Sequence, residues 1–288
     1  MNVDLEGRVV QVSSLDRVLW PETGTTKAHL LEYYLQVAPL LLPHLADRPV
    51  TLHRYPTGVT GKHFFQTRTP PHPEWVRTVT LSYERTGKTF DAPVVDDLAS
   101  LVWAVNLTTI EFHPFLATTG SLDRPTALVL DLDPGLPAGF VQACEVGLLL
   151  RAELAARGLP SYPKTSGGKG LHLFAPATGT YDETKALARE LARGLATRIP
   201  DLVVDRMTKS LRAGRVLVDW SQNDPGKSTV APWSVRGLSR PTVSVPVTWE
   251  EVEAVVLSRD PRPLLIGLDD VPRRIDRYGD LFAPLAAG

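Results

Sequence analysis

The sequence has a single cysteine, Cys144, among its 288 residues. An intrachain disulfide and a cysteine-ligated zinc site are therefore excluded, which is typical of proteins from a reducing compartment. Long apolar runs are also lacking, because the most apolar stretch, residues 37–46, is short and contains Pro39 and Pro43. Residues 1–11 mix acidic, basic and apolar side chains, which is not the pattern of a signal peptide. These absences predict a soluble, cytoplasmic protein with no membrane partner.

An excess of charge of one sign is also missing. The chain has 31 Lys and Arg against 32 Asp and Glu, which gives a formal net charge of -1. No global basic field marks a nucleic-acid partner, so nucleic-acid binding would require a local basic surface. The hydrophobic fraction of 43% and the charged fraction of 22% are ordinary for a globular protein, and the length fits one large domain or two small ones.

Helix and strand patterns alternate along the chain. Thr26 is a candidate N-cap for a helix that ends near Pro43, and helical spacing recurs further on. We expect helices at 27–42, 96–107, 139–157 and 181–196, and strands at 126–133, 161–165, 171–175 and 215–220. This order predicts an α+β (mixed α/β) fold. It also suggests an N-terminal α/β module at 1–120 and a larger module at 121–288, packed together as one domain.

Three aspartates stand out at strand ends. Asp131 and Asp133 are two residues apart in an apolar strand, so they project on one side, roughly 6.5–7 Å apart. Asp219 ends a second apolar strand. Carboxylate oxygens suit Mg²⁺ or Mn²⁺, and a pair of such ions is a common device for in-line phosphoryl transfer. The alternative is that these acids merely face solvent.

A glycine-rich basic loop, residues 164–172, lies between two predicted strands. Its glycines permit close approach of an anion, and Ser166 and Lys169 can donate to phosphate oxygens. The spacing is not that of a Walker A loop. His172 points away from its apolar neighbours and can reach the same site, although a plain polar hairpin explains the pattern as well. Further along, we expect Arg236 to bind phosphate and Arg212 to lie on a solvated basic face.

Taken together, these motifs resemble the polymerase domain of bacterial ligase D, in the archaeo-eukaryotic primase superfamily. The resemblance rests on the segments 130–134, 166–172, 218–223 and 231–236, and on further matches at 15–21, 24–27, 63–66, 110–114 and 246–250. They follow the family's order over nearly the whole chain. The fold implied is a primase-polymerase catalytic core with an RRM-like sheet, preceded by the N-terminal α/β module.

The activity that the resemblance implies is nucleotidyl transfer in DNA repair by non-homologous end joining. The enzyme would add nucleotides, preferably ribonucleotides, to a primer 3′-hydroxyl at gaps and double-strand-break ends, using two Mn²⁺ or Mg²⁺ ions. Its substrates would be NTP or dNTP and DNA carrying a 5′-phosphate. Ku and a DNA ligase would be its partners, at the bacterial nucleoid. Two alternatives remain open: a primase that starts chains de novo, and a non-catalytic DNA-end-binding module.

The resemblance also assigns roles to particular residues. The expected metal ligands and catalytic residues are Asp131, Asp133 and Asp219, and the expected nucleotide contacts are Ser166, Lys169, His172, His113, Gln222 and Arg236. The expected DNA contacts are Arg17 and Lys27 for the 5′-phosphate, Phe64 and Phe65 for the template base, and Arg54 for nucleotide or template. Arg17 stands where the family commonly has lysine. His53 has no assigned role, and residues 85–88 match a family loop associated with synapsis of DNA ends.

Overall fold

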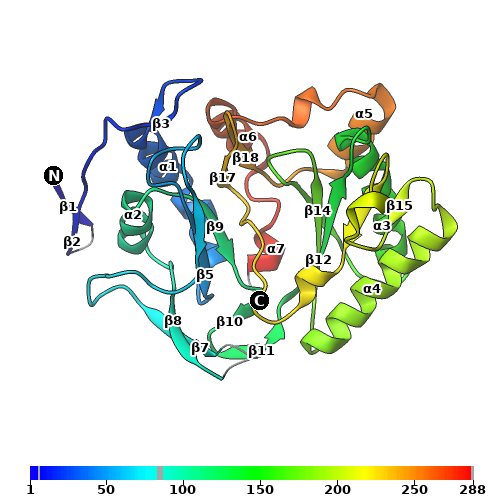
Figure 1. Ribbon diagram of the computed structural model, residues 1–288, viewed down its shortest axis with the longest axis horizontal. Helices are drawn as coiled ribbons and strands as arrows, with labels where there is room; N and C mark the ends of the chain where they lie inside the picture. The colour runs from blue at the N-terminus through cyan, green and yellow to red at the C-terminus, as the bar shows by residue number, and fades with distance from the viewer. Residues whose placement is uncertain (6, 83–86, 287–288) are drawn as a thin grey trace. The chain divides into compact units, whose positions relative to one another are not determined.

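The computed structural model describes residues 1–5, 7–82 and 87–286. The chain forms two compact units, which we call unit 1 and unit 2 (Figure 1). Unit 1 comprises Met1–Ser121 and Ser228–Thr242, and unit 2 comprises Leu122–Lys227 and Val243–Gly288. Helices and sheets occur in both, which confirms the predicted α+β class. That the two units form one polymerase domain stays a prediction.

The described part of unit 1 contains a helix of 19 residues, a helix of 9 residues and several small sheets. Its elements are β1 (Asn2–Leu5), β2 (Arg8–Gln11), β3 (Val18–Trp20), β4 (Thr25–Thr26), α1 (Lys27–Leu45), β5 (Val50–Arg54), β6 (Phe64–Gln66), β7 (Thr78–Ser82), β8 (Thr89–Pro93), α2 (Leu98–Asn106), β9 (Thr109–Pro114), β10 (Ala117–Thr118) and β17 (Ser234–Gly237). The strands β6, β5 and β9 form a three-stranded sheet in that order. Where the chain passes between the units it forms β11 (Ser121–Pro125) and β18 (Pro241–Ser244), which pair with β10 and β17.

Helix α1 begins where the sequence predicts and ends later. The Thr26 hydroxyl accepts a hydrogen bond from the backbone N–H of His29, as an N-cap should. The predicted end near Pro43 is wrong, because the helix continues to Leu45 with Pro39 and Pro43 inside it. Both prolines are on the exposed side, while Leu41 and Leu45 are fully buried. Packing of the inner face thus outweighs the hydrogen bonds that the prolines remove.

Unit 2 is built on one five-stranded sheet with the order β13-β14-β12-β16-β15. The strands are β12 (Ala127–Pro134), β13 (Tyr162–Thr165), β14 (Leu171–Pro176), β15 (Val203–Val204) and β16 (Val216–Asp219). The helices are α3 (Phe140–Ala155), α4 (Tyr181–Arg198), α5 (Trp249–Ser258), α6 (Val271–Tyr278) and α7 (Ala283–Ala286), with 3₁₀ turns at Lys209–Leu211, Ser221–Asn223, Arg262–Leu264 and Leu268–Asp270. All neighbouring strands are antiparallel except β15 and β16.

The helices α3 and α4 lie on the same side of this sheet (Figure 1). A side chain at Gly147 of α3 would meet Leu132, Leu171 and Leu173, so these leucines face the helix. Because strand side chains alternate between faces, Asp131, Asp133 and His172 face the other way. The apolar half of the alternation therefore builds the core, and the polar half is gathered on the opposite face.

Asn223 extends the sheet beyond the end of β16. Its Oδ1 accepts from the backbone N–H of Val129 at 2.8 Å, and its Nδ2 donates to the carbonyl of Val129 at 2.7 Å. The register of β16 against β12 covers only residues 131–134, so the amide takes the place of a strand partner at 129. Asn223 is fully buried and also donates to the carbonyl of Trp220 at 2.9 Å. It thereby holds the turn that follows Asp219.

No helix in the described part of the chain is both long enough and apolar enough to span a bilayer.

Replacing Asn223 with Ala should lower the free energy of unfolding by about 2–5 kcal/mol, because it leaves the buried N–H and C=O of Val129 without the amide. Urea unfolding followed by circular dichroism measures this. The exposed Asn2→Ala is the matched control and should change stability by less than about 0.5 kcal/mol. Equal stability of the two variants would contradict this role of Asn223.

Candidate functional site

A single row of polar residues crosses four strands of the unit 2 sheet. Asp131 on β12 lies opposite Asp219 on β16 and, on its other side, opposite His172 on β14. His172 in turn lies opposite Lys164 on β13. We call Lys164, His172, Asp131 and Asp219 the unit 2 row. Asp133 is two residues along β12 from Asp131 and shares its face. The structure therefore brings together the three aspartates and His172.

Asp133 is paired with basic side chains. Lys169 Nζ lies 3.1 Å from its Oδ1 and donates to the carbonyl of Pro134 at 2.7 Å. Arg212 donates to its Oδ2. Arg212 was expected on a solvated face, and that expectation is wrong, since its side chain is only 21% exposed and lies against Asp133. Carboxylates that share a face repel each other, so compensating cations are required there.

Asp219 is held by the turn that follows it. Its Oδ1 accepts from the backbone N–H and the hydroxyl of Ser221, at 2.8 and 2.7 Å. Its Oδ2 accepts from Gln222 Nε2 at 3.3 Å. Gln222, predicted as a nucleotide contact, therefore lies beside a predicted metal ligand.

The aspartates suit a hard divalent cation in their chemistry, since they are carboxylates on one sheet face with Asp131 and Asp219 directly opposed. Their oxygens are not gathered as tightly as in a preformed cage. In residues 1–5, 7–82 and 87–286, the three His, Cys, Asp or Glu side chains whose ligand atoms all lie within 4.8 Å of one another are His53, Glu111 and His113. Asp133 would have to exchange its contacts with Arg212 and Lys169 to join the other two aspartates around an ion.

Lys164 contacts Nδ1 of His172, the ring nitrogen that is not beside Asp131. Its Nζ is fully buried, lies 3.1 Å from His172 Nδ1 and donates to Ser244 Oγ at 2.7 Å. With Lys164 as an ammonium group, which can only donate, Nδ1 accepts, and a neutral His172 ring then carries its proton on Nε2. His172 Nε2 lies 3.3 Å from Asp131 Oδ1. The Nε2–H therefore faces the carboxylates, as a donor to Asp131 or to an anion beside it. Lys164 is not among the site residues predicted from the sequence.

Ser166 shapes the glycine-rich loop. Its Oγ accepts from the backbone N–H groups of Gly168 and Gly170, at 3.2 and 3.1 Å. A Cβ at Gly170 would come within 2.6 Å of the carbonyl oxygen of Leu132, so only glycine fits at that position. The loop thus packs against β12 next to Asp133. Contact of Ser166 with a triphosphate stays a prediction.

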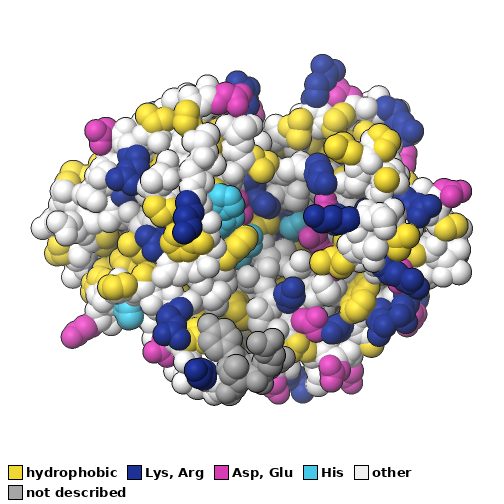
Figure 2. Space-filling view, in the orientation of Figure 1, with side chains coloured by type: hydrophobic (Ala, Val, Ile, Leu, Met, Phe, Trp, Pro, Cys, Tyr) yellow, Lys and Arg dark blue, Asp and Glu magenta, His cyan; other side chains and the backbone are white. Residues whose placement is uncertain are grey.

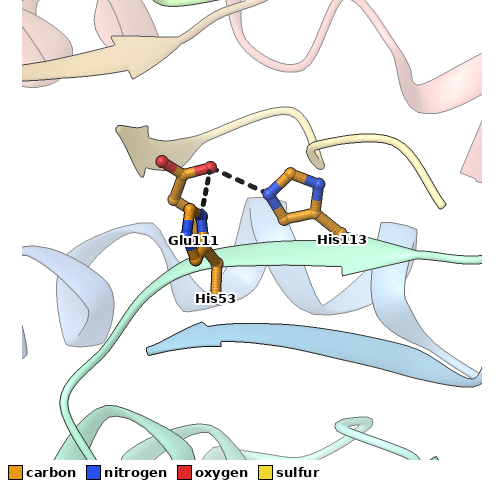
Figure 3. A group of neighbouring side chains, drawn as sticks. All are labelled: His53, Glu111 and His113. Carbon is orange, nitrogen blue, oxygen red and sulfur yellow. Dashed lines mark hydrogen bonds and ion pairs between the residues drawn. The ribbon is translucent and has the colours of Figure 1, made fainter. Parts of the chain in front are cut away.

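Unit 1 contains a second cluster, on β5 and β9. Glu111 and His113 are two residues apart on β9, and His53 lies opposite Glu111 on β5. Glu111 Oε2 is 2.8 Å from His113 Nε2 and 3.3 Å from His53 Nδ1 (Figure 3). All three residues are buried. Two imidazoles and one carboxylate at this spacing form a donor set that divalent transition metals accept.

Glu111, which is 2% exposed, is not among the site residues predicted from the sequence. Burial alone would raise the pKa of Glu111, but hydrogen bonds from His113 and His53 and the charge of Arg236 hold it well below its usual range. Burial lowers the pKa of His113, and the neighbouring Glu111 offsets part of that shift. The cluster thus holds an ionised carboxylate beside a histidine that burial tends to keep neutral.

Arg236, a predicted phosphate contact, lies beside the same carboxylate. Its Nε is 3.3 Å from Glu111 Oε2, an ion pair without hydrogen-bond geometry. The next residue, Gly237, donates its backbone N–H to Glu111 Oε1 at 2.9 Å. Two of the predicted nucleotide contacts, His113 and Arg236, are therefore brought together by Glu111.

The predicted aromatic pair is at the surface of unit 1, with Phe64 38% and Phe65 60% exposed. The Phe65 ring stacks on His53, with centroids 3.9 Å apart. Arg54 lies over the Phe64 ring at 5.6 Å and donates to Gln66 Oε1 at 2.6 Å. On the face of the molecule drawn in Figure 2, histidine side chains lie close to hydrophobic side chains and to Lys or Arg side chains. An exposed aromatic platform with a nearby cation is a suitable surface for an unpaired base.

Lys27, the predicted 5′-phosphate contact, is 2% exposed. Its Nζ donates to the carbonyl of Ser13 at 2.7 Å and to Asn106 Oδ1 at 2.6 Å. Burial, and next the charge of Arg17, lower its pKa to about 8. Arg17 is exposed, and its guanidinium donates to the carbonyl of Pro56. Two cations close enough to perturb each other form a natural anion site.

The predicted synapsis loop lies largely outside the described residues, because 83–86 are not among them. Nothing about its structure therefore bears on that prediction.

Comparison with known proteins gives concordant results. The family described as "LigD, primase-polymerase domain" matches residues 26–282. The chain is 40% identical over 283 residues to the multifunctional non-homologous end joining protein LigD of Mycolicibacterium smegmatis, covering 96% of this chain and 36% of that protein. It is 32% identical over 275 residues to the bifunctional LigD of Bacillus subtilis, covering 94% of this chain and 43% of that protein. The chain thus spans between about a third and a half of the length of these relatives.

A solved structure agrees in fold over almost its whole length. It is the polymerase domain from Mycobacterium tuberculosis ligase D in complex with DNA, with a TM-score of 0.88 and 39% sequence identity. The similarity covers 96% of this chain and 98% of that one.

Lys164→Met should allow both neutral tautomers of His172 to be populated, because methionine has a similar apolar side chain but donates no proton to Nδ1. Nitrogen-15 NMR of the imidazole groups, assigned through His172→Gln, should show the Nε2–H form in the unmutated protein and a mixture in the variant. Lys169→Met is the matched control and should leave the His172 signals in place. An unchanged tautomer in Lys164→Met would contradict the assignment.

Proposed function

The chain belongs to the LigD primase-polymerase domain family of nucleotidyltransferases, and we propose that it extends the 3′-hydroxyl of a primer strand during the repair of broken DNA. The family assignment confirms the resemblance drawn from the sequence motifs, and the structural match agrees with the predicted fold. The observation that carries the proposed activity is the unit 2 row, in which two opposed carboxylates lie beside a histidine donor.

The proposed substrates are gapped DNA, double-strand-break ends and nucleoside triphosphates, with ribonucleotides preferred over deoxyribonucleotides. Support comes from the relatives, which are named as non-homologous end joining proteins, and from the related polymerase domain solved with DNA. The proposed partners are Ku and a DNA ligase activity, and the place of action is the bacterial cytoplasm at the nucleoid.

Asp131, Asp133 and Asp219 are the residues that we propose to hold two Mn²⁺ or Mg²⁺ ions. Such ions would lower the pKa of the primer 3′-hydroxyl and neutralise charge on the triphosphate. Around them, His172 Nε2–H, Lys169 and Arg212 are cationic or donor groups that face the carboxylates and can bind phosphate oxygens. Ser166 and Gln222 complete this set, and His113 and Arg236 are the proposed nucleotide contacts of unit 1.

The proposed DNA contacts lie in unit 1. Phe64 and Phe65 would stack on the template base, with Arg54 beside them. Lys27 and Arg17 would bind the 5′-phosphate of the downstream strand. Support for the phosphate site comes from the lowered pKa of Lys27, since a dianion would compensate the cost of charging a buried amine.

Asp133→Ala should abolish primer extension and leave gapped-DNA binding within about twofold, because the substitution removes a proposed metal ligand and no DNA contact. Extension of a labelled primer on a one-nucleotide gap with Mn²⁺ and ribonucleotides measures the first effect. Fluorescence anisotropy of the same DNA measures the second.

The exposed Asp201→Ala is the matched control for this variant and should extend the primer normally. Substantial extension by Asp133→Ala would contradict the assignment of Asp133 as a metal ligand. If the unmutated protein bound gapped DNA tightly but added nothing, it would be an end-binding module. Synthesis on a bare single-stranded template would instead indicate a primase.

The preference for a 5′-phosphorylated gap should weaken above pH 8. Below about pH 8 the Lys27 amine of the free protein is charged and attracts the phosphate, whereas at higher pH it must first take up a proton. The phosphate itself stays a dianion over this range, since its second pKa is near 6. The affinity ratio for phosphorylated over unphosphorylated gaps, measured from pH 7 to 9.5, should therefore fall. Lys27→Met should show a small ratio at every pH, and a flat ratio in the unmutated protein would contradict the site.

A further inference from the structure

Four hydrogen-bond donors and one cation surround the Glu111 carboxylate in unit 1. Its Oε1 accepts from the Tyr55 hydroxyl at 3.1 Å and from the backbone N–H of Gly237 at 2.9 Å. Its Oε2 faces His113 Nε2 at 2.8 Å, His53 Nδ1 at 3.3 Å and Arg236 Nε at 3.3 Å. These groups come from β5, β9 and β17 and the residue after β5. A carboxylate has about four lone-pair sites, so Glu111 is saturated.

Arg236 decides how this cluster is used. The spacing of His53, Glu111 and His113 would suit a metal ion, but a guanidinium nitrogen already lies 3.3 Å from Glu111 Oε2. A divalent cation bound to that oxygen would lie next to a fixed positive charge in a buried setting, where repulsion is strong. The Arg236 charge therefore balances Glu111, and the cluster is complete as a hydrogen-bonded network.

The network also reaches the exposed aromatic surface. Phe65, His53 and Glu111 are direct partners across β6, β5 and β9, and the Phe65 ring stacks on His53. His53 Nε2 lies 2.9 Å from Nδ1 of the exposed His63. Phe65, which is predicted to stack on a template base, is therefore connected through His53 and Glu111 to His113 and Arg236, which are predicted to contact the nucleotide.

We propose that Glu111 is a positioning residue for nucleotide binding. Its carboxylate fixes the ring of His113 and the guanidinium of Arg236 in one arrangement. It also holds the ring of His53, on which Phe65 stacks. This inference rests on the proposed function, because it assumes that His113 and Arg236 meet the incoming nucleoside triphosphate. The substrate class that it serves is a nucleotide with an anionic phosphate chain, since Arg236 offers a cation to the phosphates. The Nε2–H of a neutral His113 is used by Glu111, so its Nδ1 is left as a hydrogen-bond acceptor.

The test compares Glu111→Gln with Glu22→Gln, whose carboxylate pairs with Arg240 at the surface of the same unit. Glu111→Gln keeps the shape but removes the charge that orients Arg236. We expect the KM for ATP in primer extension to rise about 10- to 100-fold, which is the worth of a charged hydrogen bond, with kcat and gapped-DNA affinity much less affected. Glu22→Gln should change none of these.

Non-additivity distinguishes positioning from a general loss of stability. If Glu111 acts through Arg236, then adding Glu111→Gln to Arg236→Gln should raise the KM little further, whereas independent effects would multiply. Should Glu111→Gln fail to fold, Tyr55→Phe provides a milder variant, because it removes one donor to Glu111 and leaves the charge. We expect a rise of about 3- to 10-fold in KM for Tyr55→Phe, the worth of one neutral hydrogen bond.

The dissociation constant of a non-hydrolysable ATP analogue, measured by calorimetry, separates failure of this inference from failure of the proposed function. If the unmutated protein adds no nucleotide but binds the analogue, the proposed activity is lost, and weaker binding by Glu111→Gln still supports the positioning role. An unchanged KM and an unchanged dissociation constant in Glu111→Gln would overturn the inference. So would one equivalent of zinc, found by mass spectrometry in the unmutated protein and lost in Glu111→Gln, because the cluster would then be a metal centre.

Discussion

The antiparallel register of β12 with its two neighbours is the constraint on which the rest of unit 2 depends. It places Asp131 directly between His172 and Asp219, and the same register across β13 adds Lys164 behind His172. A shift of β12 by one residue would turn Asp131 and Asp133 into the face covered by α3. The leucines that face α3 prevent that shift, because they would become exposed. Core packing and site geometry are therefore two consequences of one alternation.

Each carboxylate on this sheet face, and the one in unit 1, is matched by donors of defined direction. Asp133 pairs with Arg212 and Lys169, Asp219 with the turn at Ser221, and Glu111 with Arg236. A chain with a formal net charge of -1 can therefore still place basic groups together at particular sites. In the structure these basic groups are paired with carboxylates. A phosphate that binds could replace a carboxylate as the partner of a basic group, and a cation could replace a basic group as the partner of a carboxylate.

The features of this site that depend on local patterns could be predicted from the sequence, whereas those that depend on contacts between distant residues could not. The two-residue spacing of Asp131 and Asp133 and the apolar strand before Asp219 were enough to place three acids on strands. Glu111 had a comparable signal, since it alternates with Ile110 and Phe112 and shares a face with His113. Its importance depends on contacts with His53 and Arg236, which are 58 and 125 residues away along the chain. Contacts between such distant residues cannot be predicted from the local patterns of a single sequence. The same holds for Lys164, Arg212 and Asn223, whose partners come from other strands. The N-cap of α1 was predictable, but its continuation past Pro43 depends on the packing of its inner face.

In the proposed mechanism the aspartates of the unit 2 sheet, and not the histidine cluster of unit 1, hold the catalytic cations. The most direct test is a crystal structure of the protein soaked in Mn²⁺ with a non-hydrolysable nucleotide, using the anomalous scattering of manganese to locate the ions. We expect anomalous peaks bounded by Asp131, Asp133 and Asp219, with Arg212 moved away from Asp133. A peak among His53, Glu111 and His113, with none beside the aspartates, would contradict this mechanism.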